Sequence, residues 1–224
     1  AANQWGTMSM AQLMDPAIDY ANNGFQASAD FVKRVQHYAS VSSAPAFAGI
    51  KTGDTVVQTQ LGSTMEAIQK DGAAAFYTGQ IAQDIAAKST LSTGDIASYQ
   101  VAVTKAPTVY YGGYTLYASD APSSGVTVLQ MMKLAEKLQM PNPSEDPGGY
   151  LKTLKQCQQI AYEARSNTLV DPNFGSRDSS YYISDDYIDS LLASTAAPVE
   201  ADPERHCTTQ FSVIDGNGMV VNVT

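Results

Sequence analysis

The chain has 224 residues and a formal net charge of −9. Such an acidic chain argues against a nucleic-acid partner and against an anionic membrane, because phosphate groups repel its surface. Apolar residues make up 44% of the chain and charged residues 16%, which indicates a globular core and excludes intrinsic disorder. One domain is expected at this length, and two small ones are possible. The sequence shows no membrane-spanning apolar run and no basic-then-apolar leader.

The first half of the sequence predicts a series of helices. Ser9 and Gln12 have the spacing of a capping box, and Gly24 can end the first helix with a left-handed backbone. Pro16 lies inside this helix and predicts a kink or a restart. The further elements expected are helices over 30–38 and 59–70, a loop over 39–55, a helix after Gly79 and a short turn from Ser92 to Asp95.

The second half predicts a hairpin and then three helices. Gly112-Gly113 predicts the turn of a β-hairpin over 110–117. A helix opening at Pro122 carries an apolar stripe that indicates core packing: Val128, Met131, Met132, Ala135 and Leu138. After a linker over 141–149, a long helix is expected to face inward with Leu151, Leu154, Gln158 and Ala161. A turn over 171–175, a helix capped by Ser184 and an exposed loop over 195–206 complete this half.

A second hairpin pattern lies near the end of the sequence. Strands over 210–215 and 219–224 flank the turn Asp215-Gly216-Asn217-Gly218. A hairpin without neighbouring strands is only marginally stable in water. The predicted fold class is therefore α+β, mostly helical with a C-terminal β-hairpin.

The two cysteines and two histidines do not indicate a disulfide framework or a metal site. Cys157 and Cys207 are expected to be two free thiols, because two cysteines make no disulfide framework. His37 and His206 have no cysteine or carboxylate partners at metal-ligand spacing, so the sequence predicts no metal site.

Two polar pairs favour structural roles over catalytic ones. Ser123-Ser124-Gly125 lacks the strand-to-helix context of a serine nucleophile and is interpreted as a helix cap. Asp185-Asp186 is interpreted as a favourable charge pair in the first turn of a helix.

A doubled threonine, Thr208-Thr209, stands directly before the C-terminal hairpin. A threonine hydroxyl needs a base, and a chain-terminal threonine carries one in its free α-amine. That amine is released if the Thr208 hydroxyl attacks the Cys207 carbonyl and water hydrolyses the resulting ester. Threonine is also common in strands because of its β-propensity, so the pair alone favours a structural interpretation. A thiol nucleophile at Cys207 is a minor alternative.

Motifs along nearly the whole chain resemble the γ-glutamyltranspeptidase family. The segment 208–215 resembles its processing junction, Thr-Thr-His-aromatic-Ser-Val-Val-Asp. Other matching segments occur in family order: Trp5-Gly6-Thr7, Gly53-Asp54 with Gln58 and Leu61, Phe76-Tyr77-x-Gly79-x-Ile81-Ala82, Tyr111-x-Gly113-Tyr114-x-x-Tyr117, Pro122-Ser123-Ser124-Gly125, Ala161-Tyr162-x-x-Arg165 and Asp171-Pro172-x-Phe174.

The resemblance implies an N-terminal-nucleophile hydrolase, an αββα sandwich that cuts itself into two subunits. Residues 1–207 would be the C-terminal part of the large-subunit region, and 208–224 the first strands of the small-subunit region. Thr208 would be the nucleophile that cleaves γ-glutamyl amides such as glutathione and passes the acyl group to water or an amino acid. No cofactor is implied. The implied location is periplasmic, secreted or at the cell surface.

Some positions depart from the family pattern. Gln210 stands where the family usually has histidine, and Val126 replaces a second glycine after Pro-Ser-Ser-Gly. The arginine for the substrate α-carboxylate, a second functional threonine and the oxyanion glycines are expected outside residues 1–224, so the isolated segment is expected to be inactive. Two alternatives stay open: another amidase of this fold, such as an acylase or a poly-γ-glutamate transpeptidase, and a non-catalytic homologue.

Overall fold

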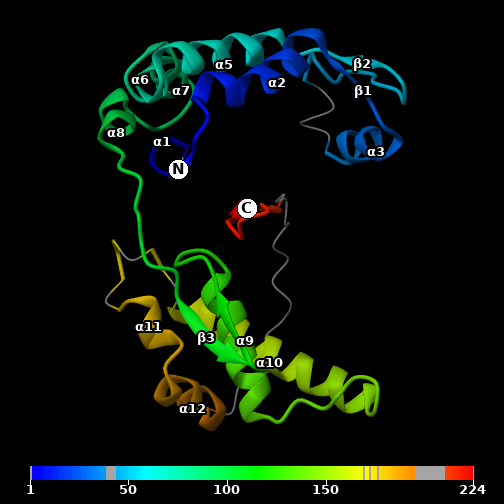
Figure 1. Ribbon diagram of the computed structural model, residues 1–224, viewed down its shortest axis with the longest axis vertical. Coiled ribbons are helices and arrows are strands. Elements are labelled where there is room, and N and C mark those ends of the chain that lie inside the picture. The colour runs from blue at the N-terminus through cyan, green and yellow to red at the C-terminus, as the bar shows by residue number, and fades with distance from the viewer. Residues whose placement is uncertain are drawn as a thin grey trace. The chain divides into compact units, whose positions relative to one another are not determined.

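The structure is a computed structural model that describes residues 2–38, 44–168, 170–171, 173–175, 177–194 and 210–223. These ranges are mostly helical and contain three two-stranded antiparallel sheets. The chain divides into two compact units, residues 1–102 and 103–224 (Figure 1). The predicted mostly helical chain with a C-terminal hairpin is thus confirmed. The predicted subunit boundary between residues 207 and 208 lies outside the described residues and stays a prediction.

The first unit contains the expected helices and some short additional elements. Its elements are α1 (Ala2–Trp5), α2 (Met10–Asn23), β1 (Phe25–Gln26), α3 (Ala29–His37), β2 (Thr55–Val56), α5 (Thr59–Asp71), α6 (Ala73–Tyr77), α7 (Gln80–Ala87) and α8 (Thr93–Ser98). A capping box begins α2 at Ser9, as predicted. Another capping box begins α8 at Ser92, where the sequence predicted only a short turn. The sequence did not predict α6 or the β1–β2 pair, because such short elements carry little periodicity.

Helix α2 lies along α5 (Figure 1). Asn22 Nδ2 donates to Glu66 Oε1 at 2.8 Å, and Gln69 Nε2 donates to the Ala11 carbonyl at 2.9 Å. A side chain at Gly62 would collide with Asn22, so this glycine permits the close approach of the two helices. Helix α2 continues through Pro16, and the alternative of a restart there is wrong.

Gly24 connects α2 to β1. Its φ of +85° favours glycine, but its ψ of 172° is extended, so it is not the left-handed helical stop that was predicted. This backbone turns the chain directly into the pairing of Phe25 with Val56. The core behind this sheet consists of Ala27, Val32, Val35, Ile50 and Val56.

The second unit contains a hairpin, four helices and the C-terminal hairpin. Its elements are β3 (Thr108–Tyr111), β4 (Tyr114–Tyr117), α9 (Gly125–Lys137), α10 (Pro147–Thr168), α11 (Ser179–Tyr182), α12 (Asp185–Ala193), β5 (Phe211–Ile214) and β6 (Val220–Val223). Gly112 and Gly113 form the two-residue turn between β3 and β4 with φ values of +57° and +89°, which confirms the predicted hairpin.

Helix α9 is central to the core of this unit. Its N-terminal half packs Val126 and Leu129 against Val109 of β3. Its C-terminal half packs Leu134 against Cys157 of α10 and Ile188 of α12. Since α9 contacts elements on several sides, its buried surface is wider than a single stripe.

The predicted inward face of α9 is partly wrong. Val128 is exposed, whereas Thr127 and Gln130 are almost fully buried. Gln130 tolerates burial because its Nε2 donates to the Tyr182 carbonyl at 3.0 Å. Ala135 was correctly placed in the core.

The predictions for the linker and for the inward face of α10 also need correction. The linker ends at Asp146, because α10 begins with Pro147 at its first position and Asp146 Oδ1 accepts from Gly149 N at 2.8 Å. Along α10, Leu151 and Gln158 are exposed, and the buried residues recur at helical spacing: Cys157, Ile160, Ala161 and Ala164.

Candidate functional site

The predicted nucleophile Thr208 and the neighbouring Cys207 lie outside the described residues, as does His206. The description resumes at Gln210, directly before β5. The described part of the candidate site is therefore the hairpin that follows the predicted junction.

The hairpin has the predicted turn. Strands β5 and β6 pair from Phe211 with Val223 to Ile214 with Val220. The Asp215 carboxylate accepts from the backbone N–H groups of Asn217 at 2.9 Å and Met219 at 2.8 Å. Gly218 has a φ of +83°, which suits glycine. The hairpin after the junction is thus held together by contacts among its own residues.

Polar side chains gather on one face of this hairpin. Asn222 Oδ1 accepts from Gln210 Nε2 at 3.0 Å and from Ser212 Oγ at 2.9 Å. The sequence did not predict this contact, although an asparagine inside the apolar strand Val220–Val223 is a signal that could have indicated it. The opposite face is apolar and exposed, with Phe211, Val213, Val221 and Val223.

Ser124 does not cap α9 as predicted. It occupies the N-cap position, but its side chain makes no capping hydrogen bond. Its Oγ instead accepts from Arg165 Nη1 of α10 at 2.6 Å. This contact joins two segments that resemble the family, Pro122-Ser123-Ser124-Gly125 and Ala161-Tyr162-x-x-Arg165.

Asp185 and Asp186 lie in the first turn of α12, as predicted. Ser184 caps this helix by accepting from Tyr187 N at 3.2 Å. A hydrogen bond and an ion pair with Lys133 of α9 hold the pKa of Asp185 below its ordinary value. Its neighbours therefore give Asp185 a structural role in joining the two helices.

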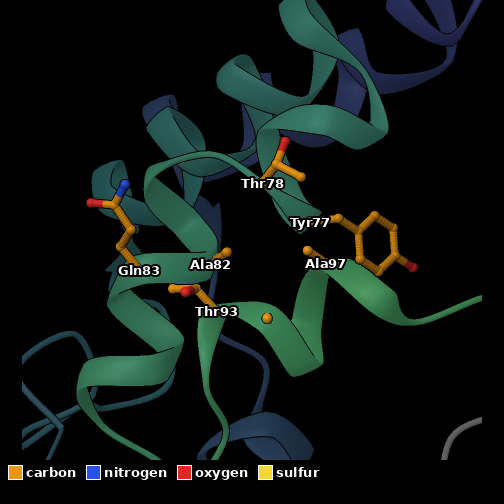
Figure 2. A pocket seen from close by; sticks show the side chains of 7 residues that line it. Tyr77, Thr78, Ala82, Gln83, Thr93 and Ala97 are labelled. Atoms are coloured by element: carbon orange, nitrogen blue, oxygen red, sulfur yellow. The ribbon is translucent and has the colours of Figure 1, made fainter.

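One pocket among the described residues lies between α6, α7 and α8 (Figure 2), and its volume is about 550 Å³. It is lined by Tyr77, Thr78, Ala82, Gln83, Thr93, Gly94 and Ala97. No carboxylate, histidine or cysteine is among these lining residues, so they offer neutral hydrogen-bonding groups but no nucleophile paired with a base.

The described ranges hold no cluster of three or more His, Cys, Asp or Glu side chains able to bind a metal ion. The same ranges contain no helix whose length and apolarity would let it cross a bilayer. Cys157 is a free thiol, as predicted. It is buried, and burial raises its pKa.

Comparison with known proteins points to one family. The model of the gamma-glutamyltranspeptidase family matches residues 1–224. The capsule biosynthesis protein CapD proenzyme of Bacillus anthracis is 35% identical over 229 residues, which cover 99% of this chain and 43% of the relative. The glutathione hydrolase proenzyme of Escherichia coli (strain K12) is 29% identical over 252 residues, covering 100% of this chain and 43% of the relative. The chain thus spans less than half the length of these curated relatives.

Solved structures agree with this assignment. The crystal structure of the Bacillus anthracis transpeptidase enzyme CapD matches with a TM-score of 0.70 and 34% identity, covering 84% of this chain and 68% of that one. The cephalosporin acylase from Bacillus halodurans matches with a TM-score of 0.82 over 99% of this chain and 45% of that one, and at 18% identity it shows a shared fold alone. With a family match over its full length and a relative of this identity, the chain belongs to the gamma-glutamyltranspeptidase family.

Proposed function

We propose that this chain is part of a self-processing γ-glutamyltransferase and hydrolase whose nucleophile is Thr208. The observation that carries the proposal is the family match over residues 1–224, which includes Thr208-Thr209 before a strand. The hairpin β5–β6 supports it, because a nucleophile at the head of a strand has a rigid support.

Self-cleavage is proposed to occur between Cys207 and Thr208. The Thr208 Oγ attacks the Cys207 carbonyl carbon, the C–N bond of the peptide breaks, and the nitrogen leaves as the protonated α-amine. Water then hydrolyses the ester, which gives a Cys207 carboxylate and a free Thr208 hydroxyl. Residues 1–207 and 208–224 would thereafter belong to different subunits.

Turnover would use the amine that cleavage releases. Its ordinary pKa is about 8, so a useful fraction is neutral near physiological pH and can accept the hydroxyl proton. The Thr208 oxygen attacks the γ-carbonyl of a substrate such as glutathione, and the departing amine takes up a proton. The resulting γ-glutamyl ester then passes its acyl group to water or to an amino acid. No cofactor is needed.

We further propose that the hairpin belongs to an αββα sandwich completed by the remainder of both subunits. Every residue of β5 and β6 is exposed, including apolar side chains on both faces. Because the family resemblance places the carboxylate-binding arginine, the second threonine and the oxyanion glycines outside residues 1–224, the isolated segment is proposed to be inactive. A periplasmic, secreted or cell-surface location is proposed from the same resemblance.

A second candidate is a transpeptidase that acts on a γ-linked glutamate polymer. The greater identity to CapD, 35% against 29% for the glutathione hydrolase, favours it. CapD is named a capsule biosynthesis protein and a transpeptidase. Acceptance of poly-γ-glutamate with little turnover of glutathione would support this candidate over the first.

Intact mass spectrometry of the full-length protein tests the proposal. The wild type is expected to split between Cys207 and Thr208, and Thr208→Ala is expected to stay whole. Thr209→Ala is the matched control, because it changes the adjacent threonine and leaves the proposed nucleophile in place. A wild type that stays whole would instead favour a non-catalytic homologue, since the required amine would not be released.

A further inference from the structure

Two asparagines in the chain precede a glycine: Asn23 at the end of α2, and Asn217 in the turn of the C-terminal hairpin. An asparagine before glycine is prone to lose its side-chain amide, because glycine has no side chain to shield its backbone nitrogen or to restrict its rotation. The structure around each pair decides how readily it reacts.

Asn217 lies in an exposed turn that closes on Asp215. Gly218 N donates to the Asp215 carbonyl at 3.1 Å, and neither Gly216 nor Asn217 has a positive φ, which fits a type I turn with Asn217 in its third position. The Asp215 carboxylate also accepts from Asn217 N at 2.9 Å and Met219 N at 2.8 Å. The side-chain amide of Asn217 makes no hydrogen bond with any described residue.

Asn23 is held by contacts that Asn217 lacks. It is the last residue of α2, and its Nδ2 donates to Asp19 Oδ1 at 2.6 Å. The following Gly24 N donates to the Tyr20 carbonyl at 3.0 Å, which extends the helical hydrogen bonding past Asn23. Opening this pair therefore requires the last turn of α2 to unwind, although α2 is packed along α5.

We propose that Asn217 is a site of spontaneous deamidation and that the Asp215 carboxylate restrains the reaction. The Gly218 nitrogen attacks Asn217 Cγ, the Cγ–Nδ2 bond breaks, and ammonia leaves with the proton of the Gly218 N–H. The product is a cyclic succinimide. Water opens this ring at Cγ to give aspartate, or at the backbone carbonyl carbon to give isoaspartate, in which the chain runs through Cβ.

Local opening controls the rate of this reaction. Ring closure must bring the Gly218 nitrogen to the side of Asn217 that carries Cβ, a backbone rotation found neither in a type I turn nor in a helix. The hydrogen bonds across the turn have to break first, and the contacts of the Asp215 carboxylate oppose this. Since a short exposed turn opens more readily than a packed helix end, Asn217 should react before Asn23.

Either product changes the hairpin. Aspartate at position 217 puts a second carboxylate beside Asp215, and like charges repel. Isoaspartate lengthens the backbone between Asp215 and Met219 by one carbon, so the 3.0 Å hydrogen bond from Asp215 N to the Met219 carbonyl loses its geometry. Deamidation should therefore loosen the pairing of Ile214 with Val220 next to the turn.

Peptide mapping of the full-length protein by mass spectrometry tests the proposal. The protein is aged in water enriched in heavy oxygen and digested in ordinary water, so that only amides lost during ageing introduce the heavy atom. Asn217 is expected to convert about 10-fold faster than Asn23 or more. In urea, where both local structures are lost, the two rates are expected to become similar, because both residues precede glycine.

Two variants test the restraint. Asp215→Ala removes the carboxylate contacts and should speed conversion of Asn217 roughly 3- to 10-fold, the effect of one hydrogen bond on the opening of the turn, with no change at Asn23. Asp19→Ala is the matched control at the other pair: it frees Asn23 Nδ2 but leaves the helical backbone in place, so Asn23 should stay slow. A variant that fails to fold is recognised because both asparagines then convert at the rates seen in urea.

Three results would overturn the inference: equal rates at Asn217 and Asn23 in the folded wild type, a folded wild type in which Asn217 keeps its amide over the time that converts it fully in urea, or a folded Asp215→Ala variant that reacts no faster than wild type. The inference does not depend on the proposed function. Self-cleavage is measured at a different bond, between Cys207 and Thr208, so failure of one proposal is distinguishable from failure of the other.

Discussion

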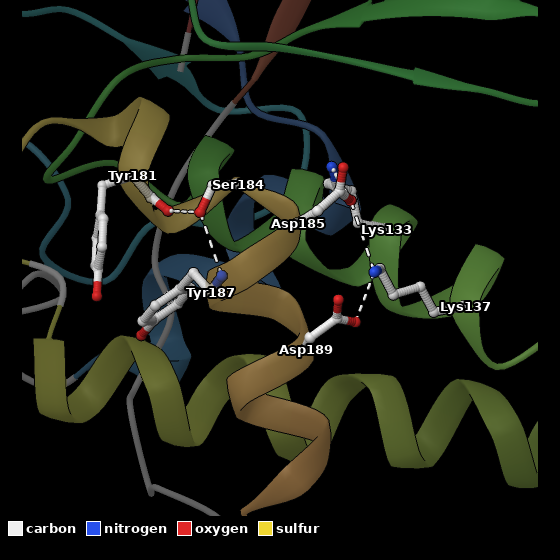
Figure 3. Close-up of polar contacts among 7 residues, drawn as sticks. All are labelled: Lys133, Lys137, Tyr181, Ser184, Asp185, Tyr187 and Asp189. Carbon is white, nitrogen blue, oxygen red and sulfur yellow. Dashed lines mark hydrogen bonds and ion pairs between the residues drawn. The ribbon is translucent and has the colours of Figure 1, made fainter.

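Lys133 on α9 and Asp185 on α12 form an ion pair with 2.9 Å between Nζ and Oδ1 (Figure 3). Lys137, one turn further along α9, lies 3.7 Å from the same carboxylate and 2.6 Å from Asp189. Two lysines one turn apart thus meet two aspartates one turn apart. Together with the buried Ile188, these contacts fix how α12 packs on α9.

Replacing Asp185 should change how stability depends on pH. Lys133 lowers the pKa of Asp185 in the folded protein, so its stabilising contribution is present above the ordinary value of about 3.9 and is lost as pH falls through the lower folded value. Asp185→Asn should therefore lower Tm near pH 7, and the difference from wild type should shrink below pH 4. Thermal unfolding followed by circular dichroism across this range measures it.

Asp186→Asn is the matched control for this experiment. Asp186 lies in the same first turn and forms no ion pair with any described residue. An equal pH-dependent loss in both variants would assign the effect to the helix dipole and not to Lys133.

The starts of three helices were a predictable part of the fold. Ser9 with Gln12, Ser92 with Asp95, and Ser184 mark helix starts, because a side-chain oxygen there satisfies backbone N–H groups that the helix leaves free. These signals are local, but a tertiary contact can override one: the Ser124 hydroxyl accepts from Arg165 and does not cap α9.

The rotation of the long helices could not be predicted. On α9, the apolar Val128 is exposed and the polar Thr127 is buried, because β3, α10 and α12 together decide which side faces the core. On α10, Leu151 is 62% exposed, although its apolar side chain indicated an inward position. Such choices depend on neighbours that are distant in sequence.

The candidate site also combines a residue that the sequence predicted with a contact that it could not predict. Thr208 was predicted from the order of motifs in the sequence, and its role remains a proposal because the described residues begin again at Gln210. The contact between Gln210 and Asn222 depends on strand register, which a hairpin pattern gives only approximately.

Gly24→Ala should destabilise the first unit more than Gly53→Ala. Both glycines have positive φ, +85° and +90°, so both substitutions cost roughly 1 kcal/mol in backbone strain. At Gly24 a Cβ would also lie 2.6 Å from Thr55 Cγ2 and 2.7 Å from the Val56 carbonyl, whereas at Gly53 nothing lies within 4 Å. Urea unfolding measures the two losses, and equal losses would show that β2 moves aside without cost.

Thr127→Val should stabilise the second unit. Thr127 is 1% exposed, and its Oγ1 has no hydrogen-bond partner among the described residues. Valine has nearly the same shape and removes the unpaired hydroxyl, so the free energy of unfolding should rise by about 1 kcal/mol. Thr127→Ser is the control: it keeps the hydroxyl, loses a methyl group and should be less stable than wild type. A less stable Thr127→Val would mean that the hydroxyl has a partner, such as a buried water.

The Cys157 thiol should react with iodoacetamide only when the core opens. It is fully buried between α9, α10 and α12, and burial raises its pKa, so both access and thiolate are lacking in the folded state. Ile188→Ala removes a buried side chain from the same cluster at a cost of roughly 2–5 kcal/mol and should speed labelling. Leu151→Ala, on the exposed side of α10, should leave the rate unchanged. Peptide mapping by mass spectrometry follows Cys157 specifically, and rapid labelling of the native wild type would contradict a closed core at this position.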